Sequence, residues 1–237
     1  MDNMDFYQSH RQRLVVSADD FGVSPRANEN ILYLISLGKI DRVGIMSYGK
    51  FSQKEVDDLI RSGVKLDIHL DILHKFNDQR SARQSAALRV LEFAIKFIFG
   101  KLSAKKIEAD WRNQIAKFKE TFGKNPDGIS SHEHVHLFPP FFKVALRLET
   151  DYSIPYIRFG DSVFMRHNKP VAHILHWLRK INRNNYIKAS RVSSGSLVSL
   201  DWIENVDKFL DSLPEGTIEI ACHPELADDF VKIKKYF

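Results

Sequence analysis

The chain is 237 residues long, with 43% hydrophobic residues, 27% charged residues and a formal net charge of +5. These values are ordinary for a globular protein and leave room for one large α/β domain with a substantial core. Lysine and arginine are spread along the chain without an aromatic-interleaved basic motif, so the composition argues against nucleic acid as a partner.

The sequence shows no sign of export or of a membrane span. Cys222 is the single cysteine, which excludes an intramolecular disulfide and suits a reducing compartment. Residues 1–13 are polar and lack the apolar stretch of a secretion signal. No run approaches the ~18 apolar residues that a spanning helix needs. We therefore expect a cytoplasmic protein, whose oligomeric state the sequence leaves open, a homodimer included.

The N-terminal part alternates predicted strands and helices. The apolar run 14–18 predicts a buried strand that leads directly into Asp19 and Asp20. A Ser-Pro pair then starts a helix. The third strand alternates so that His69 shares one face with two aspartates. The expected elements are strands at 14–18, 42–46 and 65–71 and helices at 25–37 and 52–61.

A long helical stretch interrupts this alternation. Residues 79–122 are too long for a plain connection and are expected to form a helical insertion over one end of the fold. Within it, residues 88–102 (LRVLEFAIKFIFGKL) have a broad apolar face, which favours a helix packed in the core. The alternative is an interfacial helix in peripheral contact with a membrane, because its charges are mostly basic and it carries three phenylalanines.

The C-terminal half returns to the alternation. Repeated strand–helix units indicate an α/β fold with a parallel sheet, closed into a barrel of seven or eight strands within a single domain. The expected elements are helices at 139–149, 170–180 and 201–213 and strands at 154–158, 186–189 and 217–221.

Three histidines stand at alternate positions in residues 131–139 (SHEHVHLFP). In an extended strand, His132, His134 and His136 would project from one face. A turn signal at 127–128 precedes the run and a Pro-Pro pair follows it. An exposed edge strand would be the plain explanation. A row of imidazoles at a strand end instead suits a metal or proton-transfer site.

Ionisable side chains follow several of the predicted strands. Besides the histidine run, Asp19 and Asp20 follow the first strand, His69 lies near the end of the third and His223 follows the last. If the sheet is parallel, all lie at one edge, where ligands bind in α/β folds. An aspartate and two histidines suit a divalent ion with open positions, a second carboxylate could act as general base, and another histidine as general acid.

The motifs at these strand ends resemble those of a known family. Residues 14–22 (LVVSADDFG) resemble the opening of the YdjC-like carbohydrate deacetylases, which include the chitooligosaccharide deacetylases and whose first strand ends in Ala-Asp-Asp-Phe-Gly. The Ile-His-Leu triplet at 68–70 is similar to the second family signature, SHEHVHLFP to the third and His223-Pro224 to the last. The motifs follow the family's order and span residues 14–224.

The resemblance implies an irregular, TIM-like (β/α) barrel that uses one divalent metal ion to remove the acetyl group from an N-acetylated sugar. By this likeness Asp20, His69 and His132 would hold the metal. Asp19 would be the general base that activates water, and His223 the general acid that protonates the departing amine. Nitrogen-rich ligation favours Zn²⁺ by affinity, whereas availability could place Mg²⁺, manganese or cobalt there.

Three further residues are expected to contact the substrate. The resemblance implies that His134 and His136 face the same cleft and orient the substrate or the metal ligands rather than bind metal themselves. Arg158, at a predicted strand end, is a candidate anchor for an acidic or hydroxylated substrate.

The sequence also departs from the family pattern. Asp67 stands where the family has the glycine of its Gly-aliphatic-His-Leu signature. Glu225 follows His223-Pro224, where the family usually has glycine. The metal and base positions survive these changes, so the chemistry is better supported than the substrate. Two alternatives stay open: a metal-dependent hydrolase of phosphoesters or cyclic amides, and a non-catalytic sugar-binding barrel.

Overall fold

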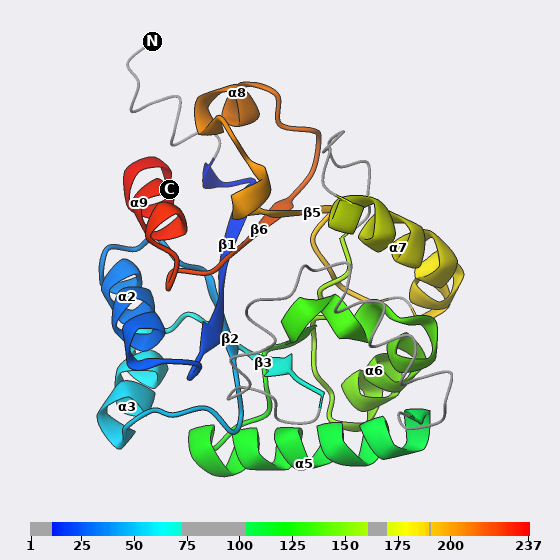
Figure 1. The fold of residues 1–237 in the computed structure, drawn as a ribbon. Helices are drawn as coiled ribbons and strands as arrows, with labels where there is room; N and C mark the ends of the chain where they lie inside the picture. Colours follow the sequence, from blue (N-terminus) through cyan, green and yellow to red (C-terminus); the bar gives the residue numbers. More distant parts are fainter. Residues whose placement is uncertain (1–10, 73–102, 161–169, 190) are drawn as a thin grey trace.

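A computed structural model describes residues 11–72, 103–160, 170–189 and 191–237. Its centre is a six-stranded sheet in the order β4-β3-β2-β1-β6-β5, in which every strand pair is parallel (Figure 1). The parallel α/β architecture predicted from the alternating pattern is therefore confirmed. The segment 88–102, with its predicted core or membrane-facing helix, lies outside the described residues. No helix in the described ranges is long and apolar enough to cross a membrane.

The sheet is built around β1 (Leu14–Phe21), which pairs with β2 (Arg42–Ile45) on one side and β6 (Ile218–Cys222) on the other. Beyond β2 lie β3 (Lys65–Leu70) and β4 (Gly128–Ser131), and beyond β6 lies β5 (Ser196–Ser199). Every residue of β4, β5 and β6 is buried, as expected for a parallel sheet that is covered on both faces.

Helices cover the sheet on several sides (Figure 1). In this view α2 (Pro25–Ser36), α3 (Gln53–Ser62) and α9 (Ala227–Tyr236) lie on one side of β1. On the other side lie α6 (Pro139–Asp151) and α7 (Pro170–Ala189), and α5 (Ala104–Phe122) runs along the bottom. The predicted helix starts at Ser24 and Ser52 are confirmed, because both side chains accept a hydrogen bond from the first turn.

The two faces of the sheet differ in chemistry because side chains alternate along a strand. Val16 and Ala18 of β1 belong to a buried apolar core that also contains Ile31 and Leu34 of α2. The alternate residue Ser17 donates a hydrogen bond of 2.7 Å to Glu219 of β6. The opposite face of the sheet therefore carries buried polar groups, and the candidate site is built on it.

Several predicted elements differ from the structure. Residues 186–189 are not a strand but the last turn of α7, because the helix predicted to stop at 180 continues to Ala189. The segment 154–158 contributes only a bridge from Ile157 to Ile129. Instead of one helix over 201–213, a 3₁₀ turn (Leu200–Trp202) precedes α8 (Val206–Asp211), which Asn205 caps. The described ranges contribute six strands to the sheet, so closure into seven or eight stays a prediction.

Candidate metal and acid–base centre

A bulge at the end of β1 aims two consecutive aspartates at one place. Ala18 pairs with Val43 but Phe21 pairs with Ile45, so β1 holds one residue more than β2 in this interval. Asp20 takes up the difference with a left-handed φ of 67°. Consecutive residues of a regular strand point to opposite faces. Because of the bulge, Asp19 and Asp20 both reach His69, at 3.8 Å from Nδ1 and 3.4 Å from Nε2 respectively.

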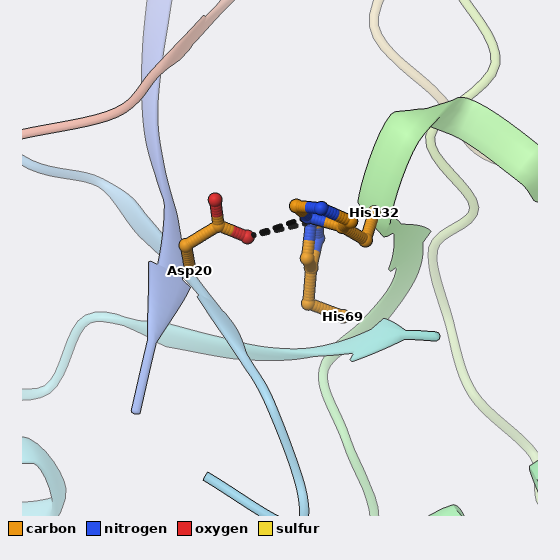
Figure 2. A group of neighbouring side chains, drawn as sticks. All are labelled: Asp20, His69 and His132. Atoms are coloured by element: carbon orange, nitrogen blue, oxygen red, sulfur yellow. Dashed lines mark hydrogen bonds and ion pairs between the residues drawn. The ribbon is translucent and has the colours of Figure 1, made fainter. Parts of the chain in front are cut away.

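Asp20, His69 and His132 form the candidate metal centre (Figure 2). One ligand atom from each lies within 4.8 Å of the others. His132 Nδ1 lies 3.0 Å from Asp20 Oδ1, and the two imidazole rings stand nearly perpendicular, at 82°. One carboxylate and two imidazoles are a donor set that fits a divalent ion and leaves further positions for water or substrate.

Asp20 and His132 shift each other's pKa in opposite directions. Burial lowers the pKa of His132, but the adjacent Asp20 carboxylate outweighs burial and raises that pKa to about 9. Burial raises the pKa of Asp20, but the surrounding imidazoles, His132 first, bring it well below its ordinary value. The proton on His132 would have to leave when an ion binds, since a metal ligand must be deprotonated.

His69 is buried and contacts Ser130 on the neighbouring strand. Its side chain is 2% exposed and its Nδ1 lies 2.8 Å from Ser130 Oγ, on the neighbouring residue of β4. Burial lowers the pKa of His69 to about 4, so the ring is neutral at neutral pH, as a ligand must be. Gly44 on β2 leaves room for this arrangement. A Cβ there would lie 2.8 Å from Asp19 Oδ1 and 3.0 Å from His69 Nδ1.

Arg158 binds Asp19 and Glu219 together. Its Nη1 and Nη2 donate to the two Asp19 oxygens at 2.6 and 2.9 Å, and its Nε donates to Glu219 at 2.8 Å. Burial raises the pKa of Asp19, but Arg158 and then His69 outweigh it and bring that pKa to about 2. Glu219 is fully buried and also accepts hydrogen bonds from Ser17, Tyr156 and Ser194.

Arg158, which was predicted to contact the substrate, lies instead in the protein interior in this structure, and a substrate contact stays a prediction. The residue is 1% exposed, and its guanidinium is occupied by two carboxylates. A strand-end position suggested a group in the cleft, but the segment that carries Arg158 turns it into the polar interior. What it does instead is fix the Asp19 carboxylate in position.

The histidine run is not a strand. Residues His132–Leu137 form a 3₁₀ segment in which Glu133 and His134 have left-handed φ values of 52° and 54°. This reversal breaks the alternation that would have placed the three imidazoles on one face. His132 alone of the three belongs to the candidate metal centre.

His136 was predicted to orient the substrate, and this stays a prediction, although its side chain is enclosed in the protein interior. It is fully buried, and its Nε2 lies 2.7 Å from the Arg158 carbonyl oxygen. Because a carbonyl only accepts, Nε2 carries the proton, and Nδ1 accepts from Ser131 Oγ at 2.5 Å. His134 is half-buried, and its Nδ1, unlike that of His136, has no hydrogen-bond partner among the described residues.

His223 stands at the edge of the centre. Its Nε2 lies 4.0 Å from Asp20 Oδ2 and its Nδ1 lies 4.0 Å from Asp229 Oδ2, while its backbone N–H donates to Asp229 at 2.8 Å. Asp229, in the first turn of α9, is buried, and burial raises its pKa. The sequence motifs include His223 but give no sign of Asp229, which is only a carboxylate six residues later at a helix start.

The two departures from the family pattern both have partners here. Asp67 accepts two hydrogen bonds from Arg42, at 2.6 and 2.7 Å, in a buried ion pair. Glu225 accepts from Ser24, the cap of α2, at 2.6 Å. Cys222 is fully buried and burial raises the pKa of its thiol, in keeping with a packing residue rather than a nucleophile.

Together these features define a parallel α/β protein with a candidate metal and acid–base centre at the carboxyl ends of its strands. The chain belongs to the YdjC-like protein family, whose family model matches residues 13–235. This finding confirms the family resemblance noted in the sequence.

Named relatives agree with this assignment, and one solved structure has a similar fold. A protein of Halalkalibacterium halodurans named carbohydrate deacetylase is 27% identical over 231 residues, covering 93% of this chain and 88% of its own. The human protein named carbohydrate deacetylase is 25% identical over 62% of this chain and 48% of its own length, so the chain spans about half of that relative. A crystal structure titled a putative cellobiose-phosphate cleavage protein, from Enterococcus faecalis, covers 92% of this chain and 83% of its own with a TM-score of 0.61 at 18% identity, a likeness of fold alone.

Proposed function

We propose that this protein is a metal-dependent carbohydrate deacetylase that hydrolyses the amide of an N-acetylated sugar, giving acetate and the free amine. The observation that carries the proposal is the convergence of Asp20, His69 and His132 with the separate carboxylate Asp19, in a chain whose relatives are named carbohydrate deacetylases. These relatives supply the substrate class, and the side chains supply a fitting chemistry.

Asp20, His69 and His132 would hold the ion. A bound divalent cation would supply Lewis-acid polarisation of the acetyl carbonyl and a lowered pKa for water. The nitrogen-rich donor set favours Zn²⁺ over Mg²⁺ by affinity.

Asp19 is the proposed general base. Its low pKa keeps it ionised at neutral pH, so it can accept the proton of the attacking water. A base works best when its pKa lies near the operating pH, so the ion pair with Arg158 costs Asp19 basicity. In return, two hydrogen bonds fix both oxygens in place beside His69. We interpret Arg158 as a positioning residue: it lowers the basicity of the Asp19 carboxylate but holds that carboxylate in a fixed orientation.

His223 is the proposed general acid. Water adds to the acetyl carbon, the C–N bond breaks, and the departing nitrogen takes the proton that His223 delivers. Partial exposure of its side chain leaves His223 accessible to a bound substrate, while the backbone bond to Asp229 holds the loop. His134 remains a candidate for substrate orientation, because its ring lies in the same segment as His132 and is not fully enclosed.

The test is acetate release from a panel of N-acetylated sugars, monosaccharides and chitooligosaccharides, with and without added divalent ion. A phosphodiester and a cyclic amide serve as competing substrates. We expect acetate from at least one sugar, and none after chelation. Metal-dependent hydrolysis of the phosphodiester or cyclic amide without acetate release would favour the alternative reaction, and metal-independent binding of sugar without hydrolysis would favour a non-catalytic barrel.

A further inference from the structure

Glu219 is a buried carboxylate to which the proposed reaction gives no role. It lies on β6 opposite Val15 of β1, deeper in the sheet than Asp19, which follows the pairing of Ala18 with Cys222 at the carboxyl end. Its side chain is fully buried. A buried charge is costly unless charged or hydrogen-bonding partners compensate its lost hydration. The partners of Glu219 therefore indicate which group it holds in place.

Both oxygens of Glu219 accept hydrogen bonds. Oε1 accepts from Ser17 Oγ at 2.7 Å and from Arg158 Nε at 2.8 Å. Oε2 accepts from the Tyr156 hydroxyl at 2.5 Å and from Ser194 Oγ at 3.3 Å. Burial raises the pKa of Glu219, but Arg158 and then Tyr156 outweigh burial and keep that pKa below its ordinary value. The carboxylate is therefore ionised at neutral pH, and these donors fix both of its oxygens.

The Tyr156 hydroxyl is itself fixed in place. The Tyr156 ring lies against the guanidinium of Arg42, whose Cζ is 3.9 Å from the ring centroid. Arg42 is held in turn by its two hydrogen bonds to Asp67. The Tyr156 hydroxyl also accepts the backbone N–H of Ser194 at 3.2 Å. Glu219 is thus bound on the side away from Asp19 by groups that cannot move independently.

Arg158 needs such a partner, because the segment that carries it forms little sheet structure. Residues 154–158 contribute only the bridge from Ile157 to Ile129, and the backbone N–H of Arg158 donates to the Ile129 carbonyl oxygen at 2.8 Å. These backbone contacts leave the long arginine side chain its rotamer freedom. With Nε bound to Glu219 and both Nη atoms bound to Asp19, the planar guanidinium has one orientation.

We propose that Glu219 is a positioning residue for Asp19 and that it acts through Arg158. It holds the Nε side of the guanidinium, so that Nη1 and Nη2 orient the Asp19 carboxylate toward the attacking water. This inference rests on the proposed function, in which Asp19 is the general base. Glu219 is not one of the proposed metal ligands, so its replacement should leave the ion bound.

The main test compares Glu219→Gln with Glu149→Gln. Both replace a buried carboxylate that pairs with an arginine by an amide of the same shape, but Glu149 pairs with Arg191, at 2.6 Å, near the end of α6 and outside the centre. We expect kcat for acetate release to fall at least ten-fold in Glu219→Gln, with KM and metal content nearly unchanged, because a misoriented base slows the chemical step. Glu149→Gln should keep the wild-type kcat. Equal kcat values per folded protein would show that Glu219 only stabilises the fold, and would overturn the proposal.

A double-mutant cycle with Arg158→Lys tests the route of this effect. Arg158→Lys already removes the two parallel hydrogen bonds to Asp19, so adding Glu219→Gln should lower kcat by less than about two-fold more. Full multiplication of the two separate losses would mean that Glu219 acts by another route, contrary to the proposal.

Tyr156→Phe is the milder variant for the case that Glu219→Gln does not fold. It keeps the ring beside Arg42 and removes one donor to Glu219 Oε2. It should lower kcat in the same direction, again with KM and metal content unchanged. A wild-type kcat in Tyr156→Phe, with Glu219→Gln unfolded, would count against the proposal.

The Nε–H proton of Arg158 gives a readout that needs no turnover. Its NMR signal is assigned by its absence in Arg158→Lys. A charge-assisted hydrogen bond to a buried carboxylate should protect this proton, and exchange with solvent should be at least ten-fold faster in Glu219→Gln. Unchanged exchange would overturn the proposal. A wild-type protein that releases no acetate would instead refute the proposed function, and the exchange rate would still show whether Glu219 holds Arg158.

Discussion

Arg158 donates two parallel hydrogen bonds to Asp19, from Nη1 to Oδ2 at 2.6 Å and from Nη2 to Oδ1 at 2.9 Å. Both side chains are almost completely buried. Only a planar guanidinium can make this fork, and the same group reaches Glu219 through Nε. The carboxylate proposed as the base is thus oriented by a charge that has no contact with solvent.

Arg158→Lys should separate orientation from charge. Lysine keeps the positive charge but cannot bind both Asp19 oxygens in the plane, so we expect a kcat at least ten-fold lower, with KM nearly unchanged. Steady-state acetate release measures both constants. A wild-type kcat in a folded Arg158→Lys protein would show that the fork is not needed. Removing the charge altogether is less informative, because two unpaired buried carboxylates would destabilise the fold.

Gly44→Ala should damage the centre without replacing any proposed catalytic side chain. The added methyl group would lie 2.8 Å from Asp19 Oδ1 and 3.0 Å from His69 Nδ1, closer than a Cβ normally approaches. We expect His69 to shift and metal affinity to fall at least ten-fold. Gly195→Ala is the control, since its nearest neighbour is the Thr217 carbonyl oxygen at 3.1 Å, outside the centre. Equal metal affinity of both variants in a titration would contradict the packing argument.

Asp229→Asn tests the proposed support of His223. The Asp229 carboxylate accepts the His223 backbone N–H at 2.8 Å and lies 4.0 Å from the His223 ring. We expect kcat to fall about ten-fold, the scale of other supporting contacts, with metal content unchanged. Asp228→Asn is the matched control, because Asp228 is exposed and pairs with Lys232 on the same helix. If both variants turn over equally, Asp229 has no part in the reaction.

His136 should make stability depend on pH below neutrality. Burial lowers the pKa of His136 to about 3, although the hydrogen bond to Arg158 opposes the shift. The unfolded chain takes up a proton near the ordinary value of about 6.5. The unfolded state therefore binds more protons between these values, and stability falls as the pH drops through this window. The His136 contribution is complete above about 6.5, and its slope reaches about 1.4 kcal/mol per pH unit.

Denaturant unfolding of wild type and His136→Gln at several pH values isolates this term. The difference in free energy of unfolding between the two proteins should shrink as the pH falls from 7 to 4. A constant difference would mean that His136 does not titrate in this range.

The sequence was informative for ionisable side chains that lie at the carboxyl ends of strands. Ionisable side chains were predicted to meet because parallel strands bring their carboxyl ends to one edge, and the family resemblance pointed to Asp20, His69 and His132 among them. The structure brings these three together. The position of His136 could not be predicted. The backbone is left-handed at Glu133 and His134, and no glycine in the sequence signals this conformation. Period-two alternation assumes an extended chain, and that assumption failed there.

Side-chain contacts between residues far apart in the sequence could not be predicted either. Arg158 and Asp19 are 139 positions apart, and no local pattern links them. Asp229 was missed for a similar reason, since a carboxylate in the first turn of a helix is ordinary there. Residues 186–189 at the end of α7 show the familiar ambiguity of short apolar runs, which fit a strand or the last turn of a helix equally well.

The most direct test of the account is the metal content of purified Asp19→Asn and His132→Ala proteins, measured by elemental analysis together with acetate release. Asp19→Asn should retain the metal at the wild-type ratio and release no acetate, because it keeps all three proposed ligands and loses the base. His132→Ala should lose both metal and activity. A His132→Ala protein with wild-type metal content, or a metal-free Asp19→Asn protein, would contradict the division of roles at this centre.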